Sequence, residues 1–127
     1  MNSLAWTFSI VLGAAGGALL RHASYLWIEA RGHGSFPLPT FFVNLVGSFL
    51  IGLVVSLGSA GVLDRFWVEL LAGGGCGAFT TFSSFSADWM RLNRTGHFGL
   101  GAAYVALTLG VGMALAALGL LLGGILR

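Results

Sequence analysis

The residues whose types and spacing point most clearly to chemistry lie in one stretch, Gly73–Phe85, which reads GGGCGAFTTFSSF. The stretch combines glycines, hydroxyl side chains and two aromatic rings inside an apolar part of the chain. In lipid, non-helical backbone is tolerated only where protein buries it or where it lines a cavity, so a glycine-rich break at this depth would free carbonyl groups. Freed carbonyls are hard oxygen ligands that suit Na⁺. The alternative is an unbroken helix whose glycines allow close packing, and the glycine spacing alone favours neither.

The hydroxyl and aromatic residues after the glycines suggest a path for an ion. Serine and threonine in membrane helices often bond back to the carbonyl four residues earlier, but hydroxyls at this density favour a polar track. Phe82 and Phe85 are three residues apart and share one helix face, where their positively polarised ring edges could touch an anion without any fixed charge. Packing in the core or against lipid is the alternative for these rings. The hydroxyl-bearing residues are Thr80, Thr81, Ser83 and Ser84.

Polar residues in the other apolar segments are candidates for the same path. Asn44 lies inside TFFVNLVGSF, where an unpaired amide would be costly, so it needs a partner helix, a water path or a ligand. Arg21 is embedded in the first apolar segment, where it either snorkels to the interface or supplies positive potential at the mouth of a cavity. Tyr104 and Thr108 share one helix face, and they either extend a polar path or bond across helices.

Composition places the whole chain in a membrane. The chain has 127 residues and only 8% charged residues, with a mean hydropathy of +0.92, whereas soluble domains carry about a quarter charged residues. The net charge of +2 comes from six scattered arginines, which excludes a nucleic-acid-binding face. Proton-coupled transport usually requires a carboxylate within the membrane. No acidic residue lies in the middle of an apolar segment here, so the sequence argues against it. The histidines lack metal-ligand spacing and no nucleophile–base pair occurs, so we do not expect an enzyme.

Four apolar segments are long enough to cross about 30 Å of hydrocarbon as helices. Their connections are short, so the sequence predicts one all-α integral membrane domain over residues 1–127, with no soluble part. The predicted helices cover residues 4–28, 36–63, 66–90 and 98–126.

The arginines outside the membrane barely select an orientation. With four spans, Arg65 and Arg127 lie on one side of the membrane, and Arg31, Arg91 and Arg94 lie on the other. Short loops rich in arginine normally stay in the cytoplasm. A count of two against three therefore means either that the rule fails here or that the chain inserts in both orientations.

Three motifs make the chain resemble the small bacterial fluoride channels of the Fluc/CrcB family. They are GGALLR at Gly16–Arg21, VNLVGSFLIG at Val43–Gly52 and GCGAFTTFSSF at Gly75–Phe85, and the similarity in size and motif order spans the whole chain. The resemblance implies a dual-topology homodimer of two antiparallel copies with two narrow fluoride pathways. It also implies passive export of toxic fluoride across the bacterial cytoplasmic (inner) membrane.

The resemblance further implies roles for individual residues. Asn44 matches an asparagine beside the pore, and Phe82 and Phe85 match paired phenylalanines that line the anion path. Gly77 and Thr80 match a break in the third helix, whose backbone carbonyls hold a structural Na⁺ at the dimer interface that is not transported. The other pore positions implied in this way are Arg21, Thr81, Ser83, Ser84, Tyr104 and Thr108.

The chain departs from the family pattern at three positions. Ala78 stands where a second glycine is common, which affects the bend. Ser84 stands where threonine is common and keeps the hydroxyl. Gly112, one turn beyond Thr108, carries no hydroxyl and shortens the polar track.

Two other functions fit a small four-helix membrane protein. A dual-topology multidrug exporter requires a carboxylate in the first helix, but here the first acid is Glu29 at the end of that helix. A non-transporting assembly subunit would need only packing glycines, and it leaves the clustered hydroxyls and Asn44 unexplained. A fluoride pore explains them, because neutral donors replace the water around the ion without trapping it.

Overall fold

Three long helices form the frame of the protein in the computed structural model, which describes residues 3–126. They are α1 (Ser3–Glu29), α2 (Leu38–Ser59) and α6 (Phe98–Ile125). All three are long and apolar enough to cross a membrane, judged by length and composition. The described residues contain no strand, and the expected all-α membrane architecture is confirmed.

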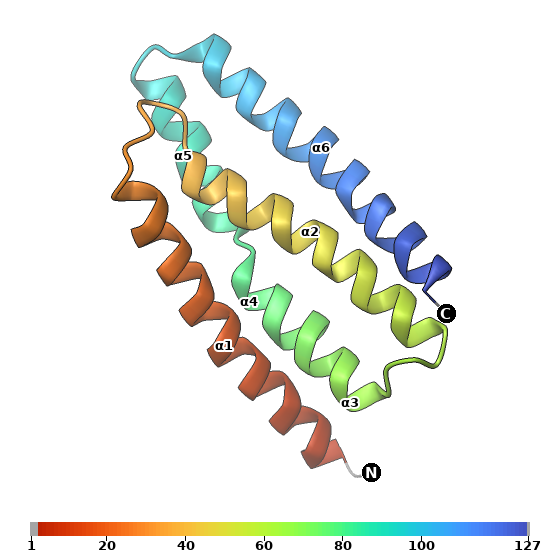
Figure 1. Ribbon diagram of the computed structural model, residues 1–127. Coiled ribbons are helices and arrows are strands. Elements are labelled where there is room, and N and C mark those ends of the chain that lie inside the picture. Colours follow the sequence, from red (N-terminus) through yellow and green to blue (C-terminus); the bar gives the residue numbers. More distant parts are fainter. Residues whose placement is uncertain (1–2, 127) are drawn as a thin grey trace.

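The third apolar segment is built from shorter pieces (Figure 1). They are α3 (Arg65–Val68), the π-helix η1 (Glu69–Cys76), α4 (Gly77–Phe79) and α5 (Phe82–Arg94). The first three pieces follow one another without interruption, and the backbone then becomes extended at Thr80 and Thr81, with ψ angles of 159° and 119°. The predicted break in the third helix is therefore confirmed.

The break lies after the glycines and not within them. The sequence left a break and close packing open for Gly73–Gly77, and the structure shows that these residues are helical, since they belong to η1 and to the start of α4. Their small size serves contact with α1 instead. A β-carbon at Gly74 would overlap the Ile10 carbonyl, and one at Gly17 would overlap the Gly75 carbonyl. Close backbone approach of this kind holds membrane helices together, so here the packing alternative is the correct one.

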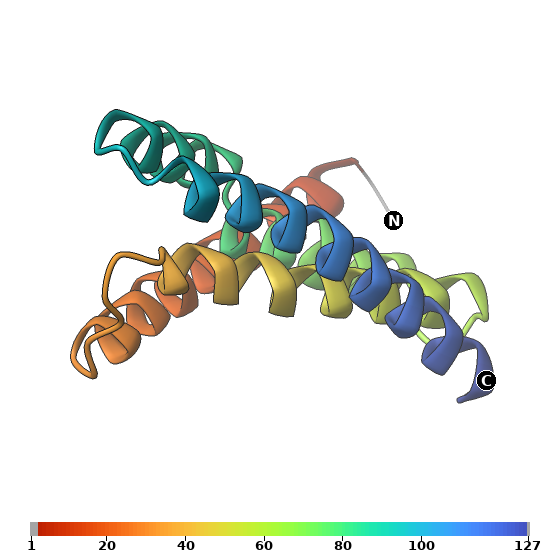
Figure 2. The same ribbon diagram turned by 90° about the horizontal axis from the view of Figure 1, so that it is seen from above.

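Glycines also bring α2 and α6 together. A β-carbon at Gly52 would overlap the Ala116 carbonyl, and one at Gly119 would overlap the Phe49 carbonyl. The two helices consequently run alongside one another, as both ribbon views show (Figure 2). Small residues at these contacts let the two backbones approach closely, as is typical of helices packed in lipid.

The connections between the helices group at the two ends of the bundle. The start of α1, the end of α6 and the α2–α3 connection lie at one end of the bundle, and the other two connections lie at the opposite end (Figure 1). Two of the turns close on a glycine with positive φ, Gly61 after α2 and Gly96 after α5. At each glycine, the next residue donates its N–H back to a carbonyl in the last turn of the helix, which ends the helix sharply.

Candidate ion pathway at the helix break

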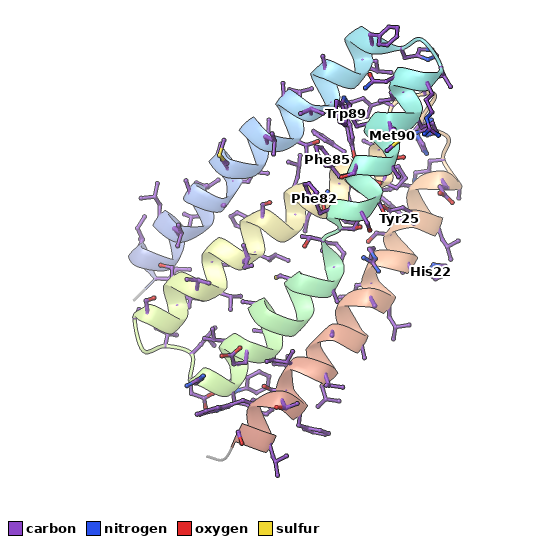
Figure 3. All side chains as sticks on the ribbon, turned by 180° about the vertical axis from the view of Figure 1, so that it is seen from behind. His22, Tyr25, Phe82, Phe85, Trp89 and Met90 are labelled. Atoms are coloured by element: carbon purple, nitrogen blue, oxygen red, sulfur yellow. The ribbon has the colours of Figure 1, made fainter. Side chains whose placement is uncertain are left out.

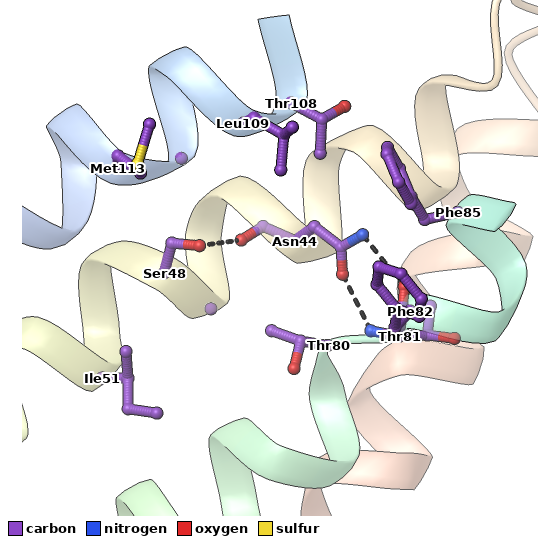
Figure 4. A pocket seen from close by; sticks show the side chains of 12 residues that line it. Asn44, Ser48, Ile51, Thr80, Thr81, Phe82, Phe85, Thr108, Leu109 and Met113 are labelled. Carbon is purple, nitrogen blue, oxygen red and sulfur yellow. Dashed lines mark hydrogen bonds between the residues drawn. The ribbon is translucent and has the colours of Figure 1, made fainter. Parts of the chain in front are cut away.

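The break is held open by one side chain from α2. Asn44 donates from Nδ2 to the Thr81 carbonyl at 3.1 Å, and the Thr81 N–H donates to Asn44 Oδ1 at 2.8 Å (Figure 4). In a continuous helix the Thr81 N–H would bond to the Gly77 carbonyl, four residues earlier. The Asn44 amide therefore replaces a helical partner, and the chain passes through Thr81 as a short extended link.

The same exchange changes the partners of the carbonyls beside the break. The Cys76 carbonyl is doubly used, since it accepts from both the N–H and the hydroxyl of Thr80 at 3.0 Å. The Gly77 carbonyl loses the Thr81 N–H as its helical partner. The Thr80 carbonyl accepts from Arg21 Nη1 at 3.5 Å, so α1 also reaches the break. Gly77 and Thr80, the predicted cation ligands, thus present carbonyls that the helix itself does not use.

An open pocket of about 340 Å³ lies beside the break. It is bounded by α2, by the extended link, by α5 and by α6 (Figure 4). Five predicted pore residues line it, and so does Thr80. These five are Asn44, Thr81, Phe82, Phe85 and Thr108. The other predicted pore residues are not part of this lining: Arg21, Ser83, Ser84 and Tyr104.

The two phenylalanines differ in exposure although they share one face of α5 (Figure 3). Phe82 is 78% exposed and Phe85 is 8% exposed. Their ring centroids are 5.7 Å apart with planes tilted by 37°, and the Phe85 and Tyr104 centroids are 5.3 Å apart with the same tilt. Three rings therefore form a row that begins at the open pocket and ends inside the protein.

Tyr104 lies at the inner end of this row. Its side chain is fully buried, and its hydroxyl has no hydrogen-bond partner among the described residues. A buried hydroxyl without a partner is costly, because it has lost its bonds to water. Tyr104 therefore carries a donor that a ligand can use.

The predicted hydroxyl track is divided between local roles and two pockets. The Thr81 hydroxyl caps α5 by accepting from the Ser84 N–H at 3.2 Å, and it lies 3.1 Å and 3.3 Å from the hydroxyls of Ser84 and Ser83. The Thr108 hydroxyl donates to the Tyr104 carbonyl at 2.7 Å, which is the back-bond that competes with a pore role. The Ser84 side chain lines a second pocket.

The second pocket, of about 290 Å³, contains a polar chain that the sequence did not reveal. The Thr40 hydroxyl donates to Asp88 Oδ2 at 2.7 Å. A hydroxyl has one hydrogen, so the Tyr25 hydroxyl must be the donor in its 2.7 Å bond to Thr40. Asp88 Oδ1 pairs with Arg91 at 3.3 Å. Thr40 and Asp88 are separated by 48 positions, so no local pattern linked them.

The fold and the site together define a small, multi-pass, all-helical membrane protein with a polar pocket at a broken helix. Residues 8–120 match the family described as CrcB-like protein, Camphor Resistance (CrcB). The chain belongs to this family. It is 42% identical over 117 residues to a fluoride-specific ion channel FluC of Thermus thermophilus, with 92% of each chain covered. It is 37% identical over 116 residues to fluoride-specific ion channel FluC 2 of Bacillus cereus, with 91% of this chain and 95% of the relative covered.

Proposed function

We propose that the protein is a fluoride-selective ion channel that carries fluoride passively out of the cytoplasm. The observation that carries this proposal is the pocket beside the break, where an amide, two aromatic rings and hydroxyls meet without a formal charge among the lining residues. The relatives named as fluoride-specific ion channels support the choice of ion. Fluoride is small and strongly hydrated, so a pore must supply donors that replace its water.

Asn44 can serve the break and the ion together. Its Nδ2 group has two hydrogens, and one of them bonds to the Thr81 carbonyl. The second remains for a ligand in the pocket. Because Asn44 is neutral, it orients toward an anion without binding it too tightly for release, which is the balance that conduction requires.

The row of three aromatic rings defines a path for the ion from the pocket into the protein. Phe82 stands at the open pocket, Phe85 lies next to it, and Tyr104 presents the unpartnered hydroxyl behind Phe85. Ring edges carry partial positive charge and favour an anion. An anion would therefore pass from the Asn44 amide along the ring edges to the Tyr104 hydroxyl, and chloride would be rejected because it is larger.

We propose further that two copies pack antiparallel in the membrane. The pocket is open and contains polar groups, and in lipid such groups must be covered by protein or by water. A second copy covers the pocket and completes its wall. The near-even arginine count of the sequence, two against three, supports insertion in both orientations.

The carbonyl oxygens at the break are suitable ligands for a structural Na⁺ at the interface of the two copies. The Gly77 carbonyl has lost its helical partner, and the one bond that the Thr80 carbonyl accepts within residues 3–126 is the long one from Arg21. Two carbonyls from each chain would then hold the ion. A bound cation would satisfy buried oxygens and favour anions in the nearby pathway, and it would not itself be transported.

Efflux from liposomes tests the proposed function. Purified protein is reconstituted in liposomes loaded with both fluoride and chloride, and two ion-selective electrodes follow release after the membrane potential is clamped at zero. We expect rapid fluoride release with chloride retained. Release of both ions, or of neither, contradicts the proposal. Proton-driven uptake of a cationic dye would indicate the exporter, and no transport at all would indicate the assembly subunit.

A further inference from the structure

Arg21 lies in the membrane-spanning helix α1 and has no carboxylate partner among the residues that the structure describes. In the described part of the chain, the ion pairs join Arg65 to Glu69 and Arg91 to Asp88. The Arg21 side chain is partly buried, and its Nη1 donates to a backbone carbonyl, that of Thr80, at 3.5 Å. Arg21 therefore places an uncompensated positive charge beside the break in the third helix.

This contact places the guanidinium on one of the carbonyls assigned to the cation. A carbonyl oxygen has two lone pairs, so Arg21 and a metal ion can share it. Sharing has a cost, because two positive charges a few ångströms apart inside a protein repel each other strongly. The repulsion is proportional to the charge of the ion, so a divalent cation is opposed twice as strongly as Na⁺.

We propose that Arg21 sets the cation preference of the break by lowering its affinity for Na⁺ and excluding divalent cations. This inference rests on the proposed Na⁺ site and names a residue that tunes the site without being its ligand. A neutral cage of carbonyl oxygens also suits Ca²⁺, which prefers oxygen ligands. The guanidinium on Thr80 supplies the discrimination that the carbonyls lack. In an antiparallel pair, each copy contributes one Arg21, so the effect acts from both sides.

The variant Arg21→Gln tests the inference, because it removes the charge and keeps an amide donor near the Thr80 carbonyl. Arg31→Gln is the matched control, since Arg31 bonds to the Trp27 carbonyl and stacks on the Trp27 ring, away from the break. The readout is thermal unfolding in detergent, followed by the fluorescence of the four tryptophans. Na⁺ or Ca²⁺ is titrated against a bulky organic cation at constant ionic strength, so the result does not depend on fluoride transport.

We expect Na⁺ to raise the melting temperature of the unmodified protein and of Arg31→Gln, and Ca²⁺ to have no effect on either. In Arg21→Gln the Na⁺ midpoint falls about tenfold or more, and Ca²⁺ becomes stabilising, as expected when a nearby like charge is removed. An unchanged Na⁺ midpoint together with continued indifference to Ca²⁺ overturns the inference. If the unmodified protein shows no response to Na⁺, the proposed Na⁺ site itself is wrong, and the inference fails with it.

A second variant separates charge from folding. Arg21→Lys keeps the positive charge in place of the guanidinium fork. It should retain the Na⁺ midpoint of the unmodified protein to within about threefold and stay insensitive to Ca²⁺, because the long-range repulsion is preserved. If Arg21→Lys tightens Na⁺ binding as much as a neutral residue is expected to, charge is not the cause and the inference is overturned, even where Arg21→Gln does not fold.

Discussion

Asn44 and Thr81 exchange two hydrogen bonds, at 3.1 Å and 2.8 Å, between a side-chain amide on α2 and the backbone of the break. The pairing resembles one rung of a β-ladder inside a helical membrane protein. It explains why the third helix stops after Phe79 and restarts at Phe82. The residue that opens the helix also lines the pocket, so the shape of the site and the position of its donor depend on one side chain.

Asn44→Asp should abolish most fluoride efflux. The substitution replaces the Nδ2 donor with an oxygen that faces the Thr81 carbonyl, and leaving that buried carbonyl unpaired costs roughly 1–3 kcal/mol. A carboxylate would also repel the anion. We expect efflux from proteoliposomes to fall at least about tenfold, which corresponds to one lost hydrogen bond to a charged ligand. Asn93→Asp, at the end of α5, makes the same change outside the pocket and should conduct normally.

Normal conduction by Asn44→Asp would show that Asn44 is only a packing residue. Melting temperatures measured alongside efflux separate the two roles. If the variant melts normally but does not conduct, Asn44 acts as the donor to the ion. If it melts at a lower temperature, Asn44 is needed to hold the break in the third helix.

Phe82→Ile should slow fluoride efflux strongly without preventing dimer assembly. Phe82 is 78% exposed in the single chain, so removing its ring leaves the core of the protomer intact. The change removes the positive ring edge at the pocket while keeping an apolar side chain. Phe8→Ile, at a side chain 60% exposed on α1, is the matched control and should conduct as the unmodified protein does. Efflux rates and size-exclusion chromatography are the measurements.

Phe85→Ile should also slow efflux, and it should lower stability as well, because Phe85 is buried against Tyr104. Replacing a packed ring with a smaller side chain typically costs about 1–3 kcal/mol. If both Phe82→Ile and Phe85→Ile conduct normally, ring edges have no part in the mechanism.

Gly17→Ala should destabilise the protein, whereas Gly16→Ala should not. A β-carbon at Gly17 would overlap the backbone carbonyl of Gly75, which cannot move aside as a flexible side chain would. Forcing α1 and η1 apart should cost about 1–3 kcal/mol. Gly16 has no neighbouring atom within 4 Å, so alanine there should be neutral or stabilising by up to about 1 kcal/mol. Thermal unfolding in detergent compares the two, and equal melting temperatures would show that the α1–η1 contact is looser than described.

Tags at the two ends of the chain should be found on both sides of the membrane. The arginine count of two against three gives almost no preference for one orientation. Protease protection of a tag in intact and permeabilised cells measures the two populations. A single uniform orientation would rule out the antiparallel pair. A variant in which one arginine is moved from one side of the membrane to the other should shift the two populations measurably.

Several properties follow from the amino-acid sequence alone. The low charge content requires lipid as the solvent, and the lengths of the apolar segments require helices, because a helix satisfies its own backbone hydrogen bonds in lipid. The small residues four apart predict close helix contacts, and the polar residues after the glycines predict a site near the middle of the third segment. Each of these depends on local composition or spacing, which a sequence displays directly.

The tertiary structure alone decides where the third helix breaks and which polar residues meet. The break lies at Thr80–Thr81 and not at the glycines, because the Thr81 N–H finds its acceptor on Asn44, 37 positions away. Ser84 and Phe85 are neighbours in sequence but line different pockets, since the turn of α5 directs them to different sides. Thr40 and Asp88 likewise meet only when α2 packs against α5. In a membrane, buried polar groups must find partners wherever packing brings them, and that choice depends on distances in space that spacing along the chain does not contain.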